Sequence, residues 1–215
     1  MVRADQVIVA LDILDVDYVL NLVDKLLPTG IRWFKVGVSL WTHAGREVVD
    51  AIKQRGGKVF LDLKLHDIPH QVGLATSAAA ELGVNLLTVH ASGGREMLEA
   101  AVANASGGMR LLAITVLTSL DAEEGEVAQL AELAHESGVH GAVCSPLEVA
   151  HLRSLLPEPF LLVTPGVRPV GSAAGDQRRI ATPEDAIASG SSLLVIGRPI
   201  TGADDPVAAV NSIIS

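Results

Sequence analysis

Residues 59–69 read Val-Phe-Leu-Asp-Leu-Lys-Leu-His-Asp-Ile-Pro, an apolar stretch that carries three charged residues within six positions. Successive side chains of a β-strand point to opposite faces, so Asp62 and Lys64 are predicted to share one face. Asp67 follows the predicted strand end, and Pro69 suits the first turn of a helix. Taken alone, this stretch fits either a structural ion pair with a helix-capping Asp67 or the charged site of an α/β enzyme.

The same order of strand and helix recurs along the chain. Strands are predicted from the apolar runs at residues 6–12, 33–38, 59–65, 86–90, 111–116, 141–145, 160–164 and 193–197. Helices are predicted at residues 16–27, 47–53, 69–82, 96–103, 127–135, 146–156, 182–185 and 205–214. Alternating units with continuously apolar strands indicate a parallel sheet that is buried on both faces.

Eight such units predict an α/β fold of the (β/α)8 (TIM) barrel type. An open doubly wound sheet is the alternative, but it usually has fewer strands, and no G-x-G-x-x-G motif follows the first strand. No linker or shift in composition divides the chain. We therefore expect residues 1–215 to form one domain.

The composition narrows the classes of function. The chain has 215 residues, 49% hydrophobic content and a formal net charge of -9, which is typical of a soluble globular protein. An acidic protein without a basic stripe, and with only 3% aromatic residues, is not expected to bind nucleic acid. No apolar run reaches the length of a membrane helix, and one cysteine, Cys144, cannot form an internal disulfide, so we expect a cytoplasmic protein away from membranes.

Polar residues stand at the ends of several predicted strands, where barrel enzymes place their sites. Asp12 ends the first strand, Lys35 interrupts the second, and Asp62 and Lys64 lie late in the third. A helix cap explains Asp12 alone, and a lysine that extends outward explains Lys35 alone. Four charged groups at one end of the barrel favour a shared site instead.

A second cluster surrounds the predicted ends of strands seven and eight. It comprises Thr164–Pro169, Gly175–Arg179 and Ile196–Ile200. Barrels often bind phosphate at this place, through glycine backbone amides and a forked arginine, and Arg198 is the best single candidate. The stretch 170–180 is long enough to act as a lid.

Known motifs for metals and nucleophiles are absent from the sequence. There is no H-E-x-x-H, C-x-x-C or calcium-loop pattern among the seven histidines, and no G-x-S-x-G elbow. His66, His70 and His90 lie near the predicted site, and we expect them to pack or form hydrogen bonds. Cys144 lies in an apolar run and is expected to be a core residue.

Together these motifs resemble the orotidine 5'-phosphate decarboxylase family in its bacterial form. The resemblance covers nearly the whole chain and is carried by ALD at 10–12, FKVG at 34–37, FLDLKLHDIP at 60–69, TVLTS at 115–119, TPGVRP at 164–169, GDQRR at 175–179 and VIGRPIT at 195–201. The D-x-K-x-x-D part is shared with two relatives, 3-keto-L-gulonate-6-phosphate decarboxylase and 3-hexulose-6-phosphate synthase. Those magnesium-dependent relatives carry a glutamate where this chain has Lys35, and an ammonium group there would repel Mg²⁺.

The resemblance implies a homodimer that converts orotidine 5'-phosphate to UMP and CO₂ without metal or cofactor. It implies that Asp62 faces the substrate carboxylate, that Lys64 donates the proton that replaces CO₂, and that Asp67 reaches the active site of the neighbouring subunit. It also implies that Asp12 and Lys35 bind the ribose hydroxyls and help to order these charges. The implied substrate-binding residues are Asp12, Lys35, Thr118, Pro165, Arg168, Gln177, Gly197 and Arg198.

One departure from the family pattern follows Pro69. The family usually has Asn-Thr after D-I-P, whereas His70 and Gln71 stand here. The ribose contact of that threonine is left open, because Gln71 offers a hydrogen bond from a longer side chain. There are two alternative functions: a sugar-phosphate lyase or aldolase of the same barrel family, and a non-catalytic barrel that senses a phosphorylated ligand.

Overall fold

The structure is a computed structural model that describes residues 1–214 except 118–119, 121, 124 and 169–180. Eight parallel strands close into a barrel in the order of the sequence, with β8 paired to β1. The strands are β1 (Val7–Ala10), β2 (Trp33–Gly37), β3 (Lys58–Leu65), β4 (Leu86–His90), β5 (Arg110–Ile114), β6 (Gly141–Val143), β7 (Leu161–Thr164) and β8 (Leu193–Ile196). The predicted (β/α)8 barrel is thereby confirmed.

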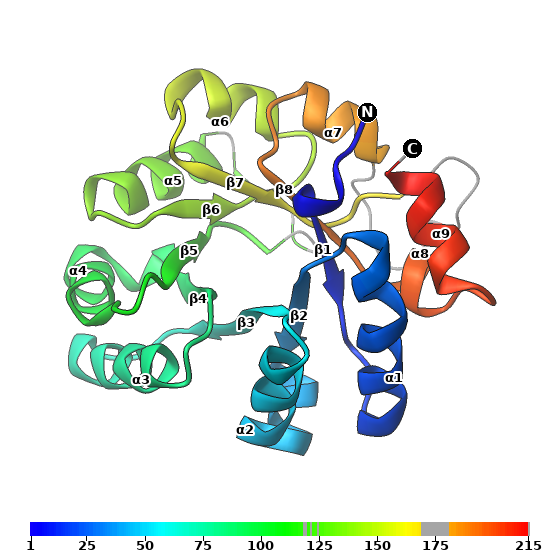
Figure 1. Ribbon diagram of the computed structural model, residues 1–215. Coiled ribbons are helices and arrows are strands. Elements are labelled where there is room, and N and C mark those ends of the chain that lie inside the picture. Colours follow the sequence, from blue (N-terminus) through cyan, green and yellow to red (C-terminus); the bar gives the residue numbers. More distant parts are fainter. Residues whose placement is uncertain (118–119, 121, 124, 169–180, 215) are drawn as a thin grey trace.

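Helices form a ring around the barrel, which Figure 1 shows from the end at which the strands begin. They are α1 (Val16–Leu26), α2 (Val38–Gln54), α3 (Pro69–Glu81), α4 (Arg95–Asn104), α5 (Glu126–Glu136), α6 (Val149–Leu155), α7 (Pro183–Ala188), α8 (Arg198–Thr201) and α9 (Pro206–Ile213). Side chains cap several of them: Asp15 accepts a hydrogen bond from the Tyr18 amide at 3.0 Å, and Thr182 accepts one from the Asp185 amide at 3.1 Å. Pro69 occupies the first turn of α3, as predicted.

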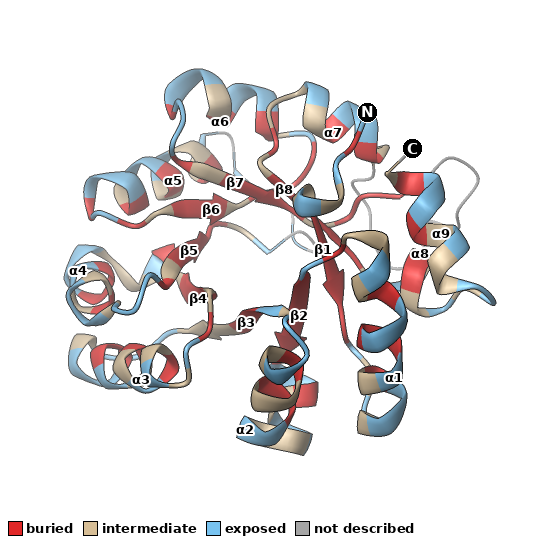
Figure 2. Ribbon diagram, viewed as in Figure 1, coloured by how far each residue is buried: buried red, intermediate tan, exposed pale blue. Residues whose placement is uncertain are grey.

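The strands are buried on both faces, as Figure 2 shows. One hydrophobic cluster joins alternate residues of successive strands, such as Ile8, Trp33, Phe60, Leu86 and Leu112. The residues between them belong to a larger cluster that also includes buried positions of the helices. This alternation explains why the strands read as continuous apolar runs, and why a charged residue inside one of them is conspicuous.

Two helices begin away from their predicted starts, and one helix was not predicted. Helix α2 begins at Val38, directly after β2, and Gly45 interrupts it with a φ of 55°, which separates its first turns from the predicted segment. Helix α6 begins at Val149 and not at Pro146, because the Glu148 side chain accepts a hydrogen bond from the Ser145 amide at 2.8 Å and residues 146–148 form a turn. Helix α8, a single turn, was not predicted.

The parallel strands end at one rim of the barrel, on the side away from the viewer in Figure 1. Asp12 follows β1, Lys35 lies in β2, Asp62 and Lys64 lie in β3, and Arg198 follows β8. None of the helices in the described ranges is long and apolar enough to cross a membrane.

Candidate active site

Four charged side chains meet at the C-terminal rim of the barrel. The Lys35 ammonium donates a hydrogen bond to Asp12 Oδ1 at 2.8 Å and lies 3.6 Å from Asp62 Oδ2. The Lys64 ammonium donates to Asp62 Oδ1 at 2.8 Å. Lysine and aspartate therefore alternate along one chain of contacts, from Asp12 through Lys35 and Asp62 to Lys64. The predicted grouping of these four residues is what the structure shows.

The centre of this charged array is shielded from water. The side chains of Lys35 and Asp62 expose only 10% and 11% of their surface, whereas that of Lys64 exposes 34%. Burial by itself raises the pKa of Asp62, but the ammonium groups of Lys35 and Lys64, with hydrogen bonds from Lys64 and Thr88, outweigh it and lower that pKa below its usual value. Asp62 is therefore ionised at neutral pH, and it faces the most accessible ammonium of the array.

The predicted regular strand around Lys64 was wrong, although the predicted meeting of Asp62 and Lys64 is confirmed. The backbone of Lys64 has a φ of 53°. Among the described residues, no other residue except glycine has a positive φ. The pairing of β3 with β4 shifts between Leu61 and Leu65. A bulge, and not simple alternation, thus aims the two side chains.

A cavity of about 430 Å³ opens above the array. Asp12, Lys35, Asp62 and Lys64 line one part of it, and Ile114, Val116, Leu117 and Val143 supply an apolar part. Pockets of this size commonly enclose small-molecule ligands. The combination suits a ligand that has a flat apolar ring beside a charged group.

Two arginines, Arg168 and Arg198, also line the cavity. Arg168 is buried, and its Nε has no hydrogen-bond partner within the described part of the chain. Burial, together with the nearby guanidinium of Arg198, lowers the pKa of Arg168. Two guanidinium groups brought together in a cavity favour an anion between them. Gly166, with a φ of 78°, and Gly197 also line the cavity, as does Pro165.

Three predicted site residues are not among the described residues that line the cavity. Asp67 is exposed in the loop between β3 and α3, where its Oδ1 accepts a hydrogen bond from the Ile68 amide at 2.7 Å. Thr118 and Gln177 lie outside the described residues, as does the predicted lid at 170–180. Gln71 is exposed in the first turn of α3.

The sequence reasoning missed Thr88 in β4. Its side chain is fully buried, and its Oγ1 donates a hydrogen bond to Asp62 Oδ1 at 3.0 Å. The signal in the sequence was a single hydroxyl within the apolar run Leu86–Val89. His66 and His90 also lie near the array, with stacked rings whose centroids are 5.3 Å apart; burial, His66 and Lys64 lower the pKa of His90, against an opposing effect of Asp62.

The array is not a site of the usual metal-binding composition. No group of three or more His, Cys, Asp and Glu side chains within the described ranges is placed to hold a metal ion. The two carboxylates that approach one another here, those of Asp12 and Asp62, are joined by the Lys35 ammonium.

A closed (β/α)8 barrel with buried charges and an arginine-lined cavity at the C-terminal rim belongs to the class of barrel enzymes that act on anionic small molecules. Residues 5–213 match the family described as "Orotidine 5'-phosphate decarboxylase / HUMPS family". The chain belongs to that family.

Individual relatives agree with this assignment. Orotidine 5'-phosphate decarboxylase of Parasynechococcus marenigrum is 50% identical, over 96% of this chain and 91% of the relative, and that of Moorella thermoacetica is 48% identical, over 97% and 90%. The crystal structure of orotidine 5'-phosphate decarboxylase from Lactobacillus acidophilus is 40% identical, with a TM-score of 0.84 and 97% of each chain covered. The similarity therefore extends along nearly the whole chain.

Proposed function

We propose that this chain is a carboxy-lyase that converts orotidine 5'-phosphate to UMP and CO₂, the last reaction of de novo UMP synthesis. Family membership supports the proposal. The observation that carries it is a cavity lined both by the Asp12–Lys35–Asp62–Lys64 array and by Arg168 with Arg198. A nucleotide with a carboxylated ring requires both groups of charges at once.

The two groups of charged residues in the cavity define how the substrate binds in this proposal. The phosphate lies between the guanidinium groups of Arg168 and Arg198, near Gly197 and Pro165, and Gln177 adds a further contact. The ribose hydroxyls bind to Asp12 and Lys35. The pyrimidine lies against the apolar wall, with Thr118 at its polar edge, and its carboxylate points toward Asp62 and Lys64. The product UMP occupies the same site.

Lys64 is the proton donor in the proposed reaction. The bond between C6 and the carboxylate carbon breaks, CO₂ leaves, and the electron pair stays on C6. The Lys64 ammonium stabilises this charge as it develops and then transfers a proton to C6. The ionised Asp62 faces the departing carboxylate, which disfavours the charged ground state, and it also holds Lys64 in place through the 2.8 Å hydrogen bond.

The protein's own charges serve this reaction without a metal or an organic cofactor. The Lys35 ammonium lies against the carboxylates of Asp12 and Asp62, at 2.8 Å and 3.6 Å, and neutralises them as a divalent cation would. A magnesium-dependent sugar-phosphate lyase needs a carboxylate where this chain has Lys35. Lys35 thus favours orotidine 5'-phosphate over a sugar phosphate as the substrate.

The direct test follows the absorbance of orotidine 5'-phosphate as it is converted to UMP. We expect turnover by the purified chain, with UMP and CO₂ formed in equal amounts. Absence of turnover, together with magnesium-dependent cleavage of 3-keto-L-gulonate 6-phosphate, would identify a sugar-phosphate lyase instead. Binding of UMP without turnover of either compound would identify a sensor.

We further propose that two chains form a dimer in which Asp67 of each contributes to the other's site. Asp67 lies outside the cavity of its own chain, and next to it Ile68 exposes 63% of its surface to water. A carboxylate outside the cavity of its own chain can act in catalysis only if a second copy brings it to another site, so the proposed role of Asp67 requires a dimer. We also propose a cytoplasmic location, because the one cysteine of the sequence, Cys144, cannot form an internal disulfide and is a free, buried thiol.

Mixing two inactive variants tests the shared site. Lys64→Ala and Asp67→Asn each lack one catalytic group, so a mixed dimer has one site with both defects and one with neither. With free exchange about half the dimers are mixed, and roughly a quarter of the wild-type activity should return. If subunits exchange and the mixture stays inactive, Asp67 acts within its own chain.

A further inference from the structure

The strand that carries Asp62 and Lys64 contains extra residues relative to its neighbour. From Leu61 to Leu65 the chain of β3 advances four residues, while the paired residues of β4 advance only two, from Leu87 to Val89. The extra residues bulge between these two pairs, and Lys64 takes its positive φ there. Bulges of this kind redirect side chains, and they leave backbone groups without a ladder partner.

Thr88 is the residue of β4 that lies opposite the bulge. Its hydroxyl accepts a hydrogen bond from the Lys64 amide at 2.8 Å and donates one to Asp62 Oδ1 at 3.0 Å. The same Asp62 oxygen accepts the 2.8 Å hydrogen bond from the Lys64 ammonium. The backbone of Lys64, the Thr88 hydroxyl, the Asp62 carboxylate and the Lys64 side chain therefore form a closed ring of contacts.

We propose that Thr88 is a positioning residue that fixes the Asp62–Lys64 pair in its reactive arrangement. This inference rests on the function proposed for the site, because Thr88 is proposed to hold Lys64, the proton donor of that reaction, in position. Thr88 does not line the cavity, so it acts through Asp62 and Lys64 and not on the substrate.

The physical reason is that one hydroxyl performs two tasks that an apolar side chain cannot perform. A left-handed backbone at a lysine costs free energy, and the hydrogen bond from the Lys64 amide to Thr88 helps to offset that cost. A buried carboxylate requires donors, and Thr88 supplies one from the side of β4. Without the hydroxyl, the Lys64 amide and Asp62 Oδ1 each lose a partner, and the bulge is free to relax.

Thr88→Val is the variant of choice because valine keeps the shape of threonine and removes the hydroxyl. We expect kcat for orotidine 5'-phosphate to fall roughly tenfold or more, since a lost hydrogen bond to a buried charge costs about one factor of ten in rate. The KM and the Kd for UMP should stay within about twofold, because the arginines that line the cavity, Arg168 and Arg198, are untouched. Thr88→Ser restores the hydroxyl and should return kcat to within about threefold of the wild type.

Thr76→Val is the matched control. Thr76 is equally buried, and its hydroxyl donates at 2.8 Å to the Val72 carbonyl within α3, away from the charged array. We expect this variant to lower the thermal midpoint without changing kcat of the folded enzyme. If Thr88→Val fails to fold, Thr88→Cys can replace it, because a thiol is a weak donor and a weak acceptor. The kcat of Thr88→Cys should lie between that of Thr88→Ser and the roughly tenfold lower value expected for Thr88→Val.

Crystal structures of the valine and serine variants test the inference without relying on turnover. In Thr88→Val the Lys64 backbone should leave the left-handed region, or its ammonium should separate from Asp62; in Thr88→Ser both should remain. An inactive wild type would overturn the proposed decarboxylation, whereas the variant structures would still decide the role of Thr88. The inference is overturned if Thr88→Val keeps wild-type kcat and geometry, or if Thr88→Ser is as impaired as Thr88→Val.

Discussion

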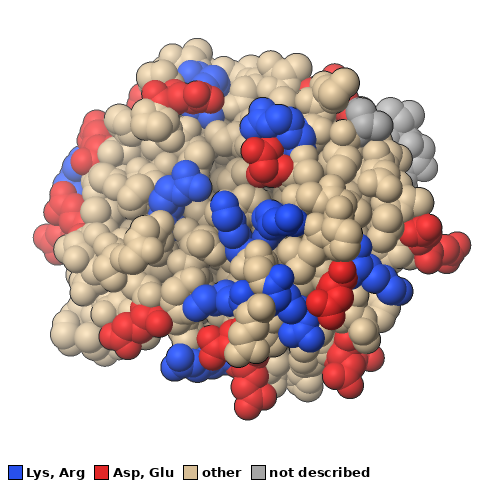
Figure 3. Space-filling model, in the orientation of Figure 1, with Lys and Arg blue, Asp and Glu red and all other residues tan. Residues whose placement is uncertain are grey.

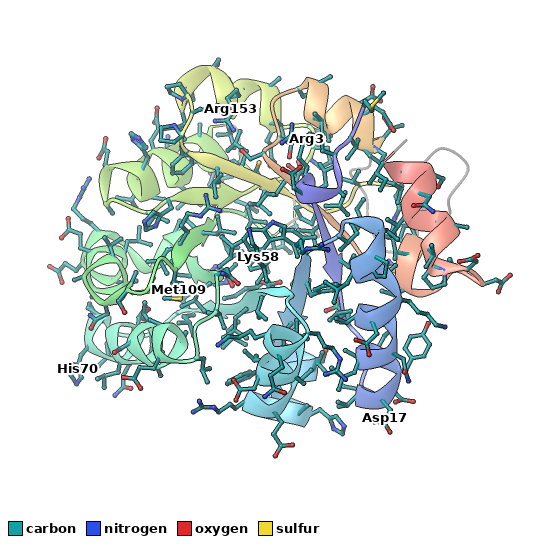
Figure 4. The ribbon with its side chains drawn as sticks, viewed as in Figure 1. Arg3, Asp17, Lys58, His70, Met109 and Arg153 are labelled. Carbon is teal, nitrogen blue, oxygen red and sulfur yellow. The ribbon has the colours of Figure 1, made fainter. Side chains whose placement is uncertain are left out.

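The two ends of the barrel use the same kinds of charged residue in different ways. At the N-terminal end, Lys and Arg side chains gather around the centre of the face in Figure 3, and Lys58 lies over the barrel axis in Figure 4. The Lys58 ammonium is 5.0 Å from the centre of the Trp33 ring, and Arg3 and Asp5 pair with about two thirds of each side chain exposed. Such exposed contacts contribute little to stability.

At the C-terminal end the charges are enclosed by protein and contact one another. Lys35 and Asp62 expose about a tenth of their side chains, and Arg168 is buried with Nε unpaired in the described part of the structure. Burying charges costs free energy that ion pairing does not reliably return. The C-terminal array thus carries a burial cost that the solvent-exposed N-terminal charges avoid, which supports the chemistry proposed for it.

The sharpest contrast lies within β3, which has a lysine near each end. We expect Lys64→Ala to lower kcat by more than about 10⁴-fold while UMP still binds, because the proton donor and its charge are both lost. Lys58→Ala should leave kcat unchanged and cost only the contact with Trp33, about 0.5–1 kcal/mol of the free energy of unfolding. Equal activity of the two variants in a decarboxylation assay would show that the ends do not differ as proposed.

The arginines permit a similar comparison. Arg198→Ala should lower kcat/KM for orotidine 5'-phosphate by roughly 10- to 100-fold, the size expected for a charge-assisted hydrogen bond to phosphate. The slow reaction of orotidine without phosphate should be unaffected. Arg110, which begins β5 at the other end, is the matched control, and Arg110→Ala should spare both substrates. If Arg198→Ala impairs both substrates equally, its role is structural.

Two glycines separate activity from stability. A Cβ on Gly37 would lie 2.9 Å from Asp12 Oδ1 and 3.0 Å from Lys35 Nζ, although its φ of -86° accepts alanine. We expect Gly37→Ala to displace those side chains and to lower kcat/KM roughly tenfold, with little change in the thermal midpoint.

Gly57, which precedes β3, provides the counterpart at the N-terminal end. Its Cβ would lie 2.7 Å from Ile52 Cγ2 and 3.1 Å from Phe34 Cδ2. Gly57→Ala should cost about 1–3 kcal/mol of unfolding free energy by overpacking and leave kcat/KM unchanged. Both variants should be compared by enzyme kinetics and by urea unfolding. A loss of kcat/KM in Gly57→Ala, with a loss of stability alone in Gly37→Ala, would contradict the placement of the active site at the C-terminal end.

The smallest expected effect is the pH dependence of stability due to Asp62. Its neighbouring ammonium groups lower the pKa of Asp62 in the folded protein in spite of burial, so the native state holds the ionised form more firmly than the unfolded chain does. Its contribution is complete above the unfolded pKa of about 3.9 and is lost as pH falls through the lower native value. The unfolding free energy of the wild type relative to Asp62→Asn should therefore decrease below about pH 3.9 in urea titrations. A difference that stays constant over this range would contradict the assigned shift.

Much of this arrangement could be predicted from the sequence. Asp12, Lys35, Asp62 and Lys64 stand out because strand alternation and the common rim of a parallel barrel bring them together, whatever the loop structures. The bulge at Lys64 could not be predicted, since the alternating pattern of β3 also fits a regular strand. Thr88 becomes relevant only through its position across from that bulge.

Other parts depend on information outside a local pattern. Helix α2 begins earlier than predicted. Its start was missed because apolar side chains such as Val38 are exposed in its first turns, so the amphipathic pattern of a helix is weak there. Asp67 lies away from the cavity of its own chain, and its proposed role depends on a second copy. Thr118 and Gln177 lie outside the described residues and stay predictions.

The central claim is that the charges at the C-terminal end of the barrel decarboxylate the substrate unaided. The most direct measurement is the rate of orotidine 5'-phosphate decarboxylation by the wild type after exhaustive treatment with EDTA, before and after addition of Mg²⁺. We predict full activity in both states, because the Lys35 ammonium provides the positive charge between Asp12 and Asp62. Loss of activity that Mg²⁺ restores would contradict the account.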